Sequence, residues 1–157
     1  MDPIPYLERV KIQSEILLPL FRRLRDEIGN ERACALLRAA VLEYAEALGQ
    51  SVAATPSGSS LDKLRTLMPI MAAGNALAIE PLVDNTEELS INVRRCEYAS
   101  YFQALGEAEF GAMITCEIDP PMTTAIGTDL GLERTQTMMR GASHCDFRWR
   151  LAQPERS

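Results

Sequence analysis

The sequence predicts an α+β fold: an antiparallel sheet of about four strands, helices packed on one face of that sheet, and a helical pair at the N-terminus. Three observations favour this class. Apolar residues recur with helical spacing over residues 1–52, and strand-like alternation appears twice, at 76–95 and at 132–151. Each alternating stretch surrounds a short turn, so the strands should form two hairpins. The sequence has no repeated strand–helix alternation and no glycine-rich phosphate loop, which argues against a nucleotide-binding fold.

Size and composition predict one globular domain. The 157 residues are 46% hydrophobic and 24% charged, which suits a single domain over 1–157 with the helical pair at 1–52 and an α+β core at 61–151. The net charge of −6 argues against nucleic-acid binding. The sequence shows neither a secretory signal nor an apolar run long enough for a membrane. It therefore predicts a cytoplasmic protein whose four cysteines are reduced.

Two amphipathic helices are expected first. The first covers Pro5–Ile28, and Pro19 should kink it because proline removes a backbone donor and clashes with the preceding turn. Gly29 and Asn30 end this helix, and the second covers Glu31–Leu48. The apolar face of the first helix is predicted to consist of Ile12, Ile16, Leu17, Leu20 and Leu24.

The middle of the chain combines a loop, a helix and the first hairpin. Residues 53–60 form a flexible connection and are a candidate mobile lid. Ser60 is predicted to cap a helix from Leu61 to about Ala73. Strands at Ala76–Val83 and Glu88–Arg95 follow. Alternation in the second strand places Leu89, Ile91 and Val93 on one face.

The last third should contain two helices and the second hairpin. The helices are expected at Cys96–Leu105 and Glu107–Glu117, and Pro120-Pro121 should exclude a helix at Asp119 or soon after. Gly141–Ser143 supplies the turn of the final hairpin. Its second strand has one apolar face, formed by Cys145, Phe147, Trp149 and Leu151, and one polar face, formed by His144, Asp146, Arg148 and Arg150.

Short stretches over nearly the whole chain resemble a known family. In the C-terminal half they are Arg95-Cys-Glu-Tyr-Ala, Leu105-Gly-Glu, Cys116-Glu-Ile-Asp119, Leu132-Glu-Arg-Thr-Gln-Thr-Met-Met-Arg-Gly and Cys145-Asp-Phe-Arg148. In the N-terminal half they are Ile12-Gln-Ser-Glu-Ile-Leu-Leu-Pro19 and Gly29-Asn-Glu-Arg-Ala33. Together they resemble the L-2-amino-thiazoline-4-carboxylic acid hydrolase family. The closing Gly-x-x-x-Cys-x-Phe is also similar to the end of 4-vinyl-reductase-type domains, which bind small molecules.

The first resemblance implies a hydrolase that opens a small nitrogen-containing ring, a cyclic amidine or cyclic amide, at a C–N or C–S bond. The second allows a non-catalytic sensor domain that binds a small molecule, and a pure interaction module is a third alternative. The enzyme requires Cys116, Asp119 and Cys145 to meet at one cavity. A sensor would have an apolar pocket without an acid/base pair near a thiol, and an interaction module would have a flat exposed apolar patch.

Two arrangements could supply the hydrolytic chemistry. In the first, a Cys116 thiolate attacks the ring and Asp119 manages the protons, with Glu15 as a second acid/base candidate. In the second, a divalent metal, zinc or manganese, activates water. Its candidate ligands are Cys96, Cys116 and Cys145, joined by His144 or Asp119, although their spacing fits no compact ligand pair. No cofactor is certain, and the sequence leaves both arrangements open.

Four further residues are candidates for binding the heterocyclic substrate. Arg95 is in register with the inward side chains of its strand, where it would pair with a substrate carboxylate or with an acidic residue. Thr135 and Thr137 share a strand face and could hydrogen-bond a ligand. His144 lies in the turn, either exposed or in contact with the ligand. Two apolar helices on a small sheet also lead us to expect a homo-oligomer.

Overall fold

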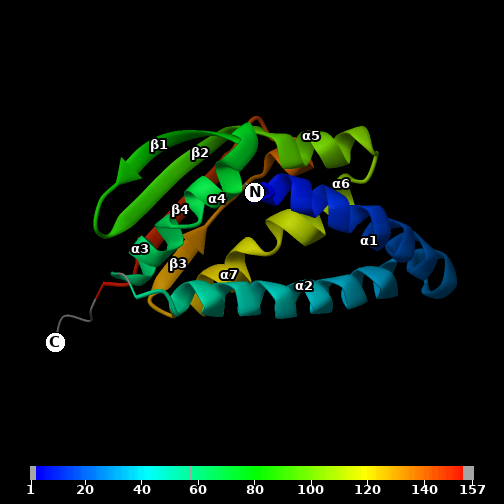
Figure 1. Cartoon of the computed structure of the whole chain (residues 1–157), viewed down its shortest axis with the longest axis horizontal. Coiled ribbons are helices and arrows are strands. Elements are labelled where there is room, and N and C mark those ends of the chain that lie inside the picture. The colour runs from blue at the N-terminus through cyan, green and yellow to red at the C-terminus, as the bar shows by residue number, and fades with distance from the viewer. Residues whose placement is uncertain (1–2, 57, 154–157) are drawn as a thin grey trace.

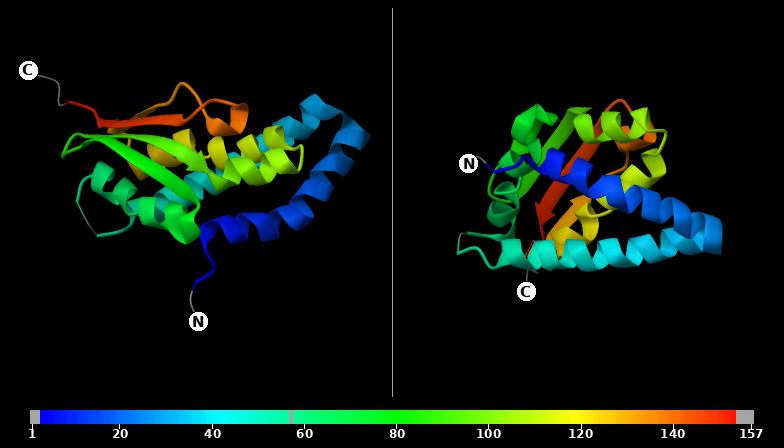
Figure 2. Two further views of the ribbon diagram at one scale, coloured as in Figure 1. Left: turned by 90° about the horizontal axis from the view of Figure 1, so that it is seen from above. Right: turned by 45° about the vertical axis from the view of Figure 1, so that its right-hand side comes forward.

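The computed structural model describes residues 3–56 and 58–153, and it confirms the predicted α+β class. Two long helices, α1 (Tyr6–Ile28) and α2 (Asn30–Ala53), precede the sheet and contact each other. All strand pairs of the sheet are antiparallel, in the order β1-β2-β4-β3. The helices gather on one face of the sheet (Figures 1 and 2). The strands are β1 (Leu77–Asp84), β2 (Glu88–Cys96), β3 (Leu130–Glu133) and β4 (Cys145–Leu151).

The junction between α1 and α2 forms as predicted. Gly29 has a φ of 84°, a conformation that glycine adopts without steric cost. Its N–H donates to the Arg25 carbonyl at 3.0 Å, and its carbonyl accepts from the Ala33 N–H at 3.1 Å. One residue therefore ends α1 and starts α2. Pro19 lies inside α1, which continues past it as one helix.

The predicted apolar face of α1 is wrong for three of its residues. Ile12, Ile16 and Leu20 are exposed, Ile16 to 77%, whereas the buried side chains include Leu18 and Phe21. Apolar residues occur on more than one side of this helix, and periodicity alone cannot tell which side meets the core. The other two predicted residues, Leu17 and Leu24, are partly buried against the core.

The helix predicted from Leu61 to Ala73 is divided into α3 (Ser60–Arg65), α4 (Met68–Ala72) and the 3₁₀ turn η1 (Ala73–Asn75). The break precedes Pro69, which has no N–H to donate to the preceding turn.

The cap of α3 is Ser59 and not the predicted Ser60. Ser59 and Asp62 form a reciprocal capping box, in which each side chain accepts from the other's backbone N–H. The hydroxyl of Ser60 instead donates to Asp129 at 2.6 Å. The proposed lid at 53–60 includes residue 57, which lies outside the described residues, and its role stays a prediction.

The two helices expected after β2 are confirmed, and a third follows where none was expected. They are α5 (Glu97–Ala104), and α6 (Ala108–Gly111) continued by a π-helical turn, η2 (Ala112–Cys116). The exclusion of a helix by Pro120-Pro121 is wrong, because α7 (Asp119–Ile126) contains both prolines in its first turn. A proline there loses no hydrogen bond, since the first N–H groups of a helix have no partner within it.

The second hairpin is shorter than predicted. After β3 the chain leaves the sheet, and the 3₁₀ turn η3 (Met138–Arg140) precedes Gly141, whose φ is 93°. The carboxylate of Asp146 accepts the N–H groups of Thr135 and Gln136 at 2.9 Å each, which replaces strand pairing. The alternation predicted for β4 is confirmed at Cys145 and Trp149, which are buried.

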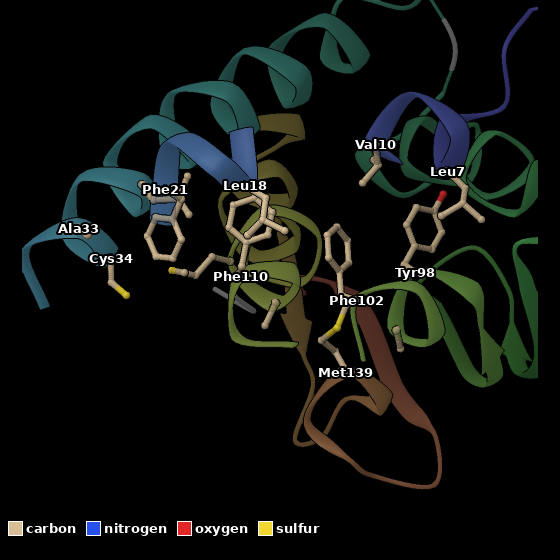
Figure 3. Packing of buried hydrophobic residues seen from close by; sticks show 14 of the residues in the cluster. Leu7, Val10, Leu18, Phe21, Ala33, Cys34, Tyr98, Phe102, Phe110 and Met139 are labelled. Atoms are coloured by element: carbon tan, nitrogen blue, oxygen red, sulfur yellow. The ribbon is translucent and has the colours of Figure 1, made fainter. Parts of the chain in front are cut away.

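The core consists of two clusters that share some partly buried residues. In the first, aromatic side chains from α6 and α5 fill the wedge between α1 and α2, and Figure 3 shows Phe110 between Phe21 and Phe102. The ring centroids of Phe21 and Phe110 lie 5.5 Å apart. The second cluster lies between the inner face of the sheet and α2, α3 and α7. Within the described ranges, no helix combines the length and apolarity needed to cross a membrane.

Candidate functional site

A cavity of about 100 Å³ lies between the inner face of the sheet and the helices that cover it. The inner side chains of β1, β2 and β4 form one wall, and the segment 67–71, the end of η2 and the start of α7 form the other. Its walls are mostly aliphatic, aromatic and methionine side chains, among them Leu67, Met71, Ile79, Ile91, Met122 and Trp149. The cavity is thus of the size and character that suit a small, largely apolar ligand.

A β-bulge decides which residue of β2 reaches the cavity. Val93 pairs with Ile79, but Arg95 pairs with the adjacent Ala78, so one extra residue is inserted in β2. The insertion reverses the alternation, and Cys96 rather than Arg95 lines the cavity. The predicted inward orientation of Arg95 is therefore wrong.

The candidates Cys116 and Asp119 reach the cavity together. Cys116 ends the π-helical turn η2, and Asp119 begins α7. The Asp119 carboxylate pairs with Arg134 at 2.5 Å, and these two side chains are only 19% and 13% exposed. The second amino group of Arg134 donates to the Cys116 carbonyl at 3.1 Å. The guanidinium also lies 5.2 Å from the centroid of Phe147, which holds it against β4.

Burial shifts the acid/base behaviour of these groups. Desolvation raises the pKa of Asp119 to about 6, even though the charge and hydrogen bond of Arg134 act in the opposite direction. Burial, with the nearby Asp119 carboxylate, raises the pKa of Cys116 to about 12, and burial raises that of Cys96 to about 11. Burial also raises the pKa of Cys145. Near neutral pH the cavity therefore holds protonated thiols and one carboxyl group close to its titration midpoint.

Thr137 has an unusual environment at the cavity wall. Its side chain is 7% exposed, and its hydroxyl oxygen is the single buried side-chain oxygen or nitrogen atom without a hydrogen-bond partner among the described residues. A buried hydroxyl without a hydrogen-bond partner is costly, so Thr137 carries a local penalty in the described structure.

The other sequence candidates lie away from the cavity. Glu15 is exposed on α1. Arg95 donates to the carbonyl and side-chain oxygens of Asn75 at 3.0 and 2.7 Å. Thr135 is exposed and bonded to Asp146, because the chain has left the sheet and its alternation with Thr137 no longer holds. His144 contacts Ser143 at 2.9 Å. The structure therefore brings Cys96, Cys116, Asp119, Thr137 and Cys145 together, and their roles stay predictions.

The donor groups at the cavity do not form a metal centre. Cys96, Cys116, Cys145 and Asp119 all line the cavity, yet nowhere in the described ranges do three His, Cys, Asp or Glu side chains approach closely enough to share one ion. The arrangement does not fit the three protein ligands of a catalytic zinc site.

Arg134 is the main residue absent from the candidates that the sequence predicts. One signal points to it: alternation from the buried Leu130 through Leu132 would place Arg134 on the inner face of its strand. An inward arginine requires a buried partner, and that partner is Asp119.

Comparisons with known proteins agree with the fold and supply the family. A model of the family described as L-2-amino-thiazoline-4-carboxylic acid hydrolase matches residues 9–149. No curated protein matches the chain significantly. The phenol-responsive sensory domain of the transcription activator PoxR, solved with phenol, has 16% sequence identity and a TM-score of 0.55. The match covers 86% of this chain and 72% of that chain.

A second similar structure is trafficking protein particle complex subunit 3 from Naegleria fowleri, covalently bound to palmitic acid. It has 16% identity and a TM-score of 0.46, and the match covers 94% of this chain and 99% of that chain. At such identities the similarity to the sensory domain shows the fold alone. The family model, in contrast, spans nearly the whole sequence, and the chain belongs to the L-2-amino-thiazoline-4-carboxylic acid hydrolase family.

Proposed function

We propose that this protein hydrolyses a small nitrogen-containing ring, a cyclic amidine or cyclic amide, and opens it at a C–N or C–S bond. Membership of the hydrolase family supports the reaction class. The observation that carries the proposal is the Asp119–Arg134 pair beside Cys116 on the wall of an apolar cavity. This combination gives a proton acceptor, a positive charge and room for a small ring.

In the proposed mechanism, the Asp119 carboxylate accepts a proton from water while the water oxygen attacks the ring carbon of the C=O or C=N group. The electron pair of that double bond moves to its heteroatom, and Arg134 stabilises the negative charge that develops there. The protonated Asp119 then donates its proton to the leaving nitrogen or sulfur as the ring bond breaks. One water molecule is added, and no other reactant is consumed. A carboxyl group with a pKa near 6 suits both transfers near neutral pH.

Cys116 has a different role in this scheme from the nucleophile that the sequence suggests. With a pKa of about 12, its thiol is protonated at neutral pH, and a thiol is a poor nucleophile compared with a thiolate. We therefore assign the attack to water and leave Cys116 as part of the cavity wall. Loss of turnover in Cys116→Ala would instead support attack on the ring by a Cys116 thiolate.

Mass-spectrometric analysis of reactions with 2-aminothiazoline-4-carboxylate and a panel of lactams, imides and cyclic amidines tests the proposal. The product should be heavier than its substrate by one water. Asp119→Asn should lower kcat by about 100-fold or more, because a general base typically contributes 10²–10⁴-fold. Asp26→Asn, an exposed change of the same type on α1, is the matched control and should leave turnover unchanged. Turnover should also survive chelation of divalent metals, and its loss would support the metal arrangement.

A non-catalytic sensor is the second candidate function. The predominantly apolar wall favours it, and the sensory domain with the similar fold contains phenol. No turnover of any ring in the panel, together with a thermal shift on ligand binding, would favour the sensor and contradict the hydrolase.

A further inference from the structure

We propose that two aromatic residues of β4, Phe147 and Trp149, are positioning residues for the ion pair at the cavity wall. The pair consists of Asp119 and Arg134, and the two stacked rings are called the aromatic bridge below. The bridge holds the guanidinium on the carboxylate, and a contact with α7 fixes its far end. For catalysis the inference rests on the proposed function, whereas for the titration of Asp119 it stands without that function.

The backbone around Arg134 gives its guanidinium little support. β3 ends at Glu133, and residues 134–137 belong to no helix or strand. Arginine is among the side chains that lose most conformational entropy on ordering, so a fixed guanidinium needs contacts at its own end. The register supplies a neighbour for it. Because Glu133 pairs with Arg148, the next position along both chains brings Arg134 beside Phe147.

Three contacts hold the guanidinium. Two are hydrogen bonds, to the Asp119 carboxylate at 2.5 Å and to the Cys116 carbonyl at 3.1 Å. The third is the Phe147 ring, whose centroid lies 5.2 Å from the guanidinium carbon of Arg134. A planar guanidinium can stack on an aromatic face while its N–H groups donate to acceptors at its edge. The ring therefore complements the two hydrogen bonds.

The Phe147 ring is itself supported by Trp149. The two residues are two positions apart on β4, so their side chains lie on the same face of the strand. Their ring centroids are 4.9 Å apart, and their planes differ by 10°. The Trp149 side chain is only 2% exposed. A ring stacked on a buried indole has little freedom to tilt, which keeps its other contacts in place.

The far end of the aromatic bridge is fixed to α7. The Trp149 indole N–H donates to the buried hydroxyl of Thr123 at 3.1 Å. Thr123 follows Asp119 by four residues on α7, so both side chains lie on the same side of that helix. The contacts therefore start and end on α7. The helix that carries the carboxylate also anchors the side chains that hold its cation.

A purely structural stack of rings makes a different prediction from a positioning one. Weakening a structural stack lowers stability and leaves the titration of Asp119 unchanged. Weakening the aromatic bridge lets the Arg134 guanidinium move away from the carboxylate. The pKa of Asp119 then rises, because a nearby positive charge favours the ionised form and desolvation opposes it. The pKa of Asp119 is therefore the readout that separates the two roles.

Other groups near Asp119 do not obscure this titration. Those that face it from α1, β2, η2, β4 and the chain beyond β3 keep one charge state between pH 4 and 8. Burial raises the pKa values of the tyrosine and the three thiols, which stay neutral, and the guanidinium stays charged. Among the described residues these groups are Tyr6, Cys96, Cys116, Cys145 and Arg134.

NMR titration of protein labelled at the aspartate carboxyl carbons measures the pKa of Asp119, and the spectrum of Asp119→Asn assigns its signal. Phe147→Leu removes the aromatic face but keeps an apolar side chain, and it should raise the pKa of Asp119 by about 0.5 or more. Phe147→Tyr keeps the aromatic face and should leave the pKa unchanged. An unchanged pKa in Phe147→Leu, or an equal rise in Phe147→Tyr, would overturn the inference.

The second variant acts at the far end of the aromatic bridge. Thr123→Val removes the acceptor of the Trp149 N–H, and we expect a rise in the pKa of Asp119 that is smaller than in Phe147→Leu. Thr124→Val is the matched control on α7, since its exposed hydroxyl bonds only within the helix, to the Pro120 carbonyl at 3.2 Å. If Phe147→Leu does not fold, Thr123→Val carries the test. No rise, or the same rise in the control, would contradict the inference.

The double variant tests whether both substitutions act by the same route. If Thr123 acts on Asp119 through the aromatic bridge, Thr123→Val should add nothing to the rise in pKa that Phe147→Leu produces. Two shifts that simply add would show independent routes and exclude the bridge.

Under the proposed function, turnover should follow the titration. The ionised Asp119 acts as the base, so the midpoint of the kcat/KM profile in Phe147→Leu should move up with its pKa. The plateau kcat should fall by about tenfold, less than the roughly 10²–10³-fold loss when a charge-stabilising donor is removed outright. A lower kcat with an unmoved midpoint would indicate a structural role alone.

The outcomes separate this inference from the proposed function. If no ring is hydrolysed but the titration shifts as expected, the positioning role stands and the hydrolase fails. If rings are hydrolysed and the titration of Asp119 is the same in every variant, the hydrolase stands and the positioning role fails.

Discussion

Among single residues, Asp119 has the most informative environment. It forms a close ion pair with Arg134, which by itself would lower its pKa, yet desolvation is larger and raises the pKa to about 6. The pKa of Asp119 therefore lies close to neutral pH, where the group can both accept and donate a proton. Burial also raises the pKa values of the thiols in the same cavity, to about 12 for Cys116 and about 11 for Cys96, so they stay protonated and unreactive near neutral pH.

The pH dependence of catalysis should follow from this pKa. A general base acts in its ionised form, so kcat/KM should fall about tenfold for each pH unit below about 6 and level off above it. Initial rates between pH 4.5 and 8.5 measure this. A profile that rises only above pH 8 would indicate a thiolate and contradict the role of Asp119.

Thr137 should respond to substitution in a way that a structural threonine does not. Thr137→Val removes an unpaired buried hydroxyl, so the free energy of unfolding should rise by about 1 kcal/mol. Thr123 is another buried threonine, and its hydroxyl accepts a hydrogen bond from the Trp149 indole at 3.1 Å. Thr123→Val should therefore lower the free energy of unfolding by about 1–3 kcal/mol. Urea denaturation of both variants gives the two values, and a loss of stability in Thr137→Val would show that the hydroxyl has a partner.

At the scale of elements, the contact between α2 and α7 positions the Asp119 carboxylate. Gly49 of α2 lies so close to α7 that an added Cβ would be 2.5 Å from the Met122 carbonyl oxygen and 2.6 Å from the Ala125 Cβ. Since Asp119 begins α7, the separation of these two helices sets how the carboxylate enters the cavity.

Gly49→Ala should therefore be destabilising, although alanine is normally favoured over glycine in a helix by about 1 kcal/mol. The clash is with backbone, so α7 must move, and we expect a lower thermal midpoint together with reduced turnover. Differential scanning fluorimetry and the hydrolysis assay measure the two effects. A raised midpoint would mean that the helices separate at little cost.

The exposed apolar residues of α1 are a candidate contact surface for the homo-oligomer expected from the sequence, and that oligomer stays a prediction. Ile12, Ile16 and Leu20 are spaced four residues apart and form an apolar stripe on the helix surface. If a second copy of the chain covers this stripe, Ile16→Lys should lower the mass measured by light scattering without altering the thermal midpoint of the monomer. The exposed Leu82→Lys on β1 is the control. An unchanged mass would place any association elsewhere.

At the scale of the whole molecule, the cavity exists because the sheet and the helices that cover it leave a space between their side chains. The inner face of the sheet and the covering helices bury most of their apolar side chains in two clusters, and the cavity remains where large side chains from both layers approach without filling the space. The ion pair lies on this boundary, with Asp119 from the helical layer and Arg134 from the chain beyond β3. The extent of the domain over 1–157 and a cytoplasmic location stay predictions.

The sequence by itself determined the fold class, the two hairpins, the apolar face of β4 and the family, because periodicity and motifs are local properties of the chain. The prolines of α7 and Pro69 are also local features of the sequence. Whether each proline starts a helix or interrupts one depends on where that helix begins.

Only the tertiary structure decided which residues share the cavity. The bulge in β2 turns Arg95 outward and Cys96 inward. The packing of α1 buries only one of its two apolar sides. Asp119 forms an ion pair with Arg134, an arginine 15 residues away in the chain. The physical reason is that each of these outcomes depends on contacts between elements. Local alternation records which residues share a face, but not what that face will contact.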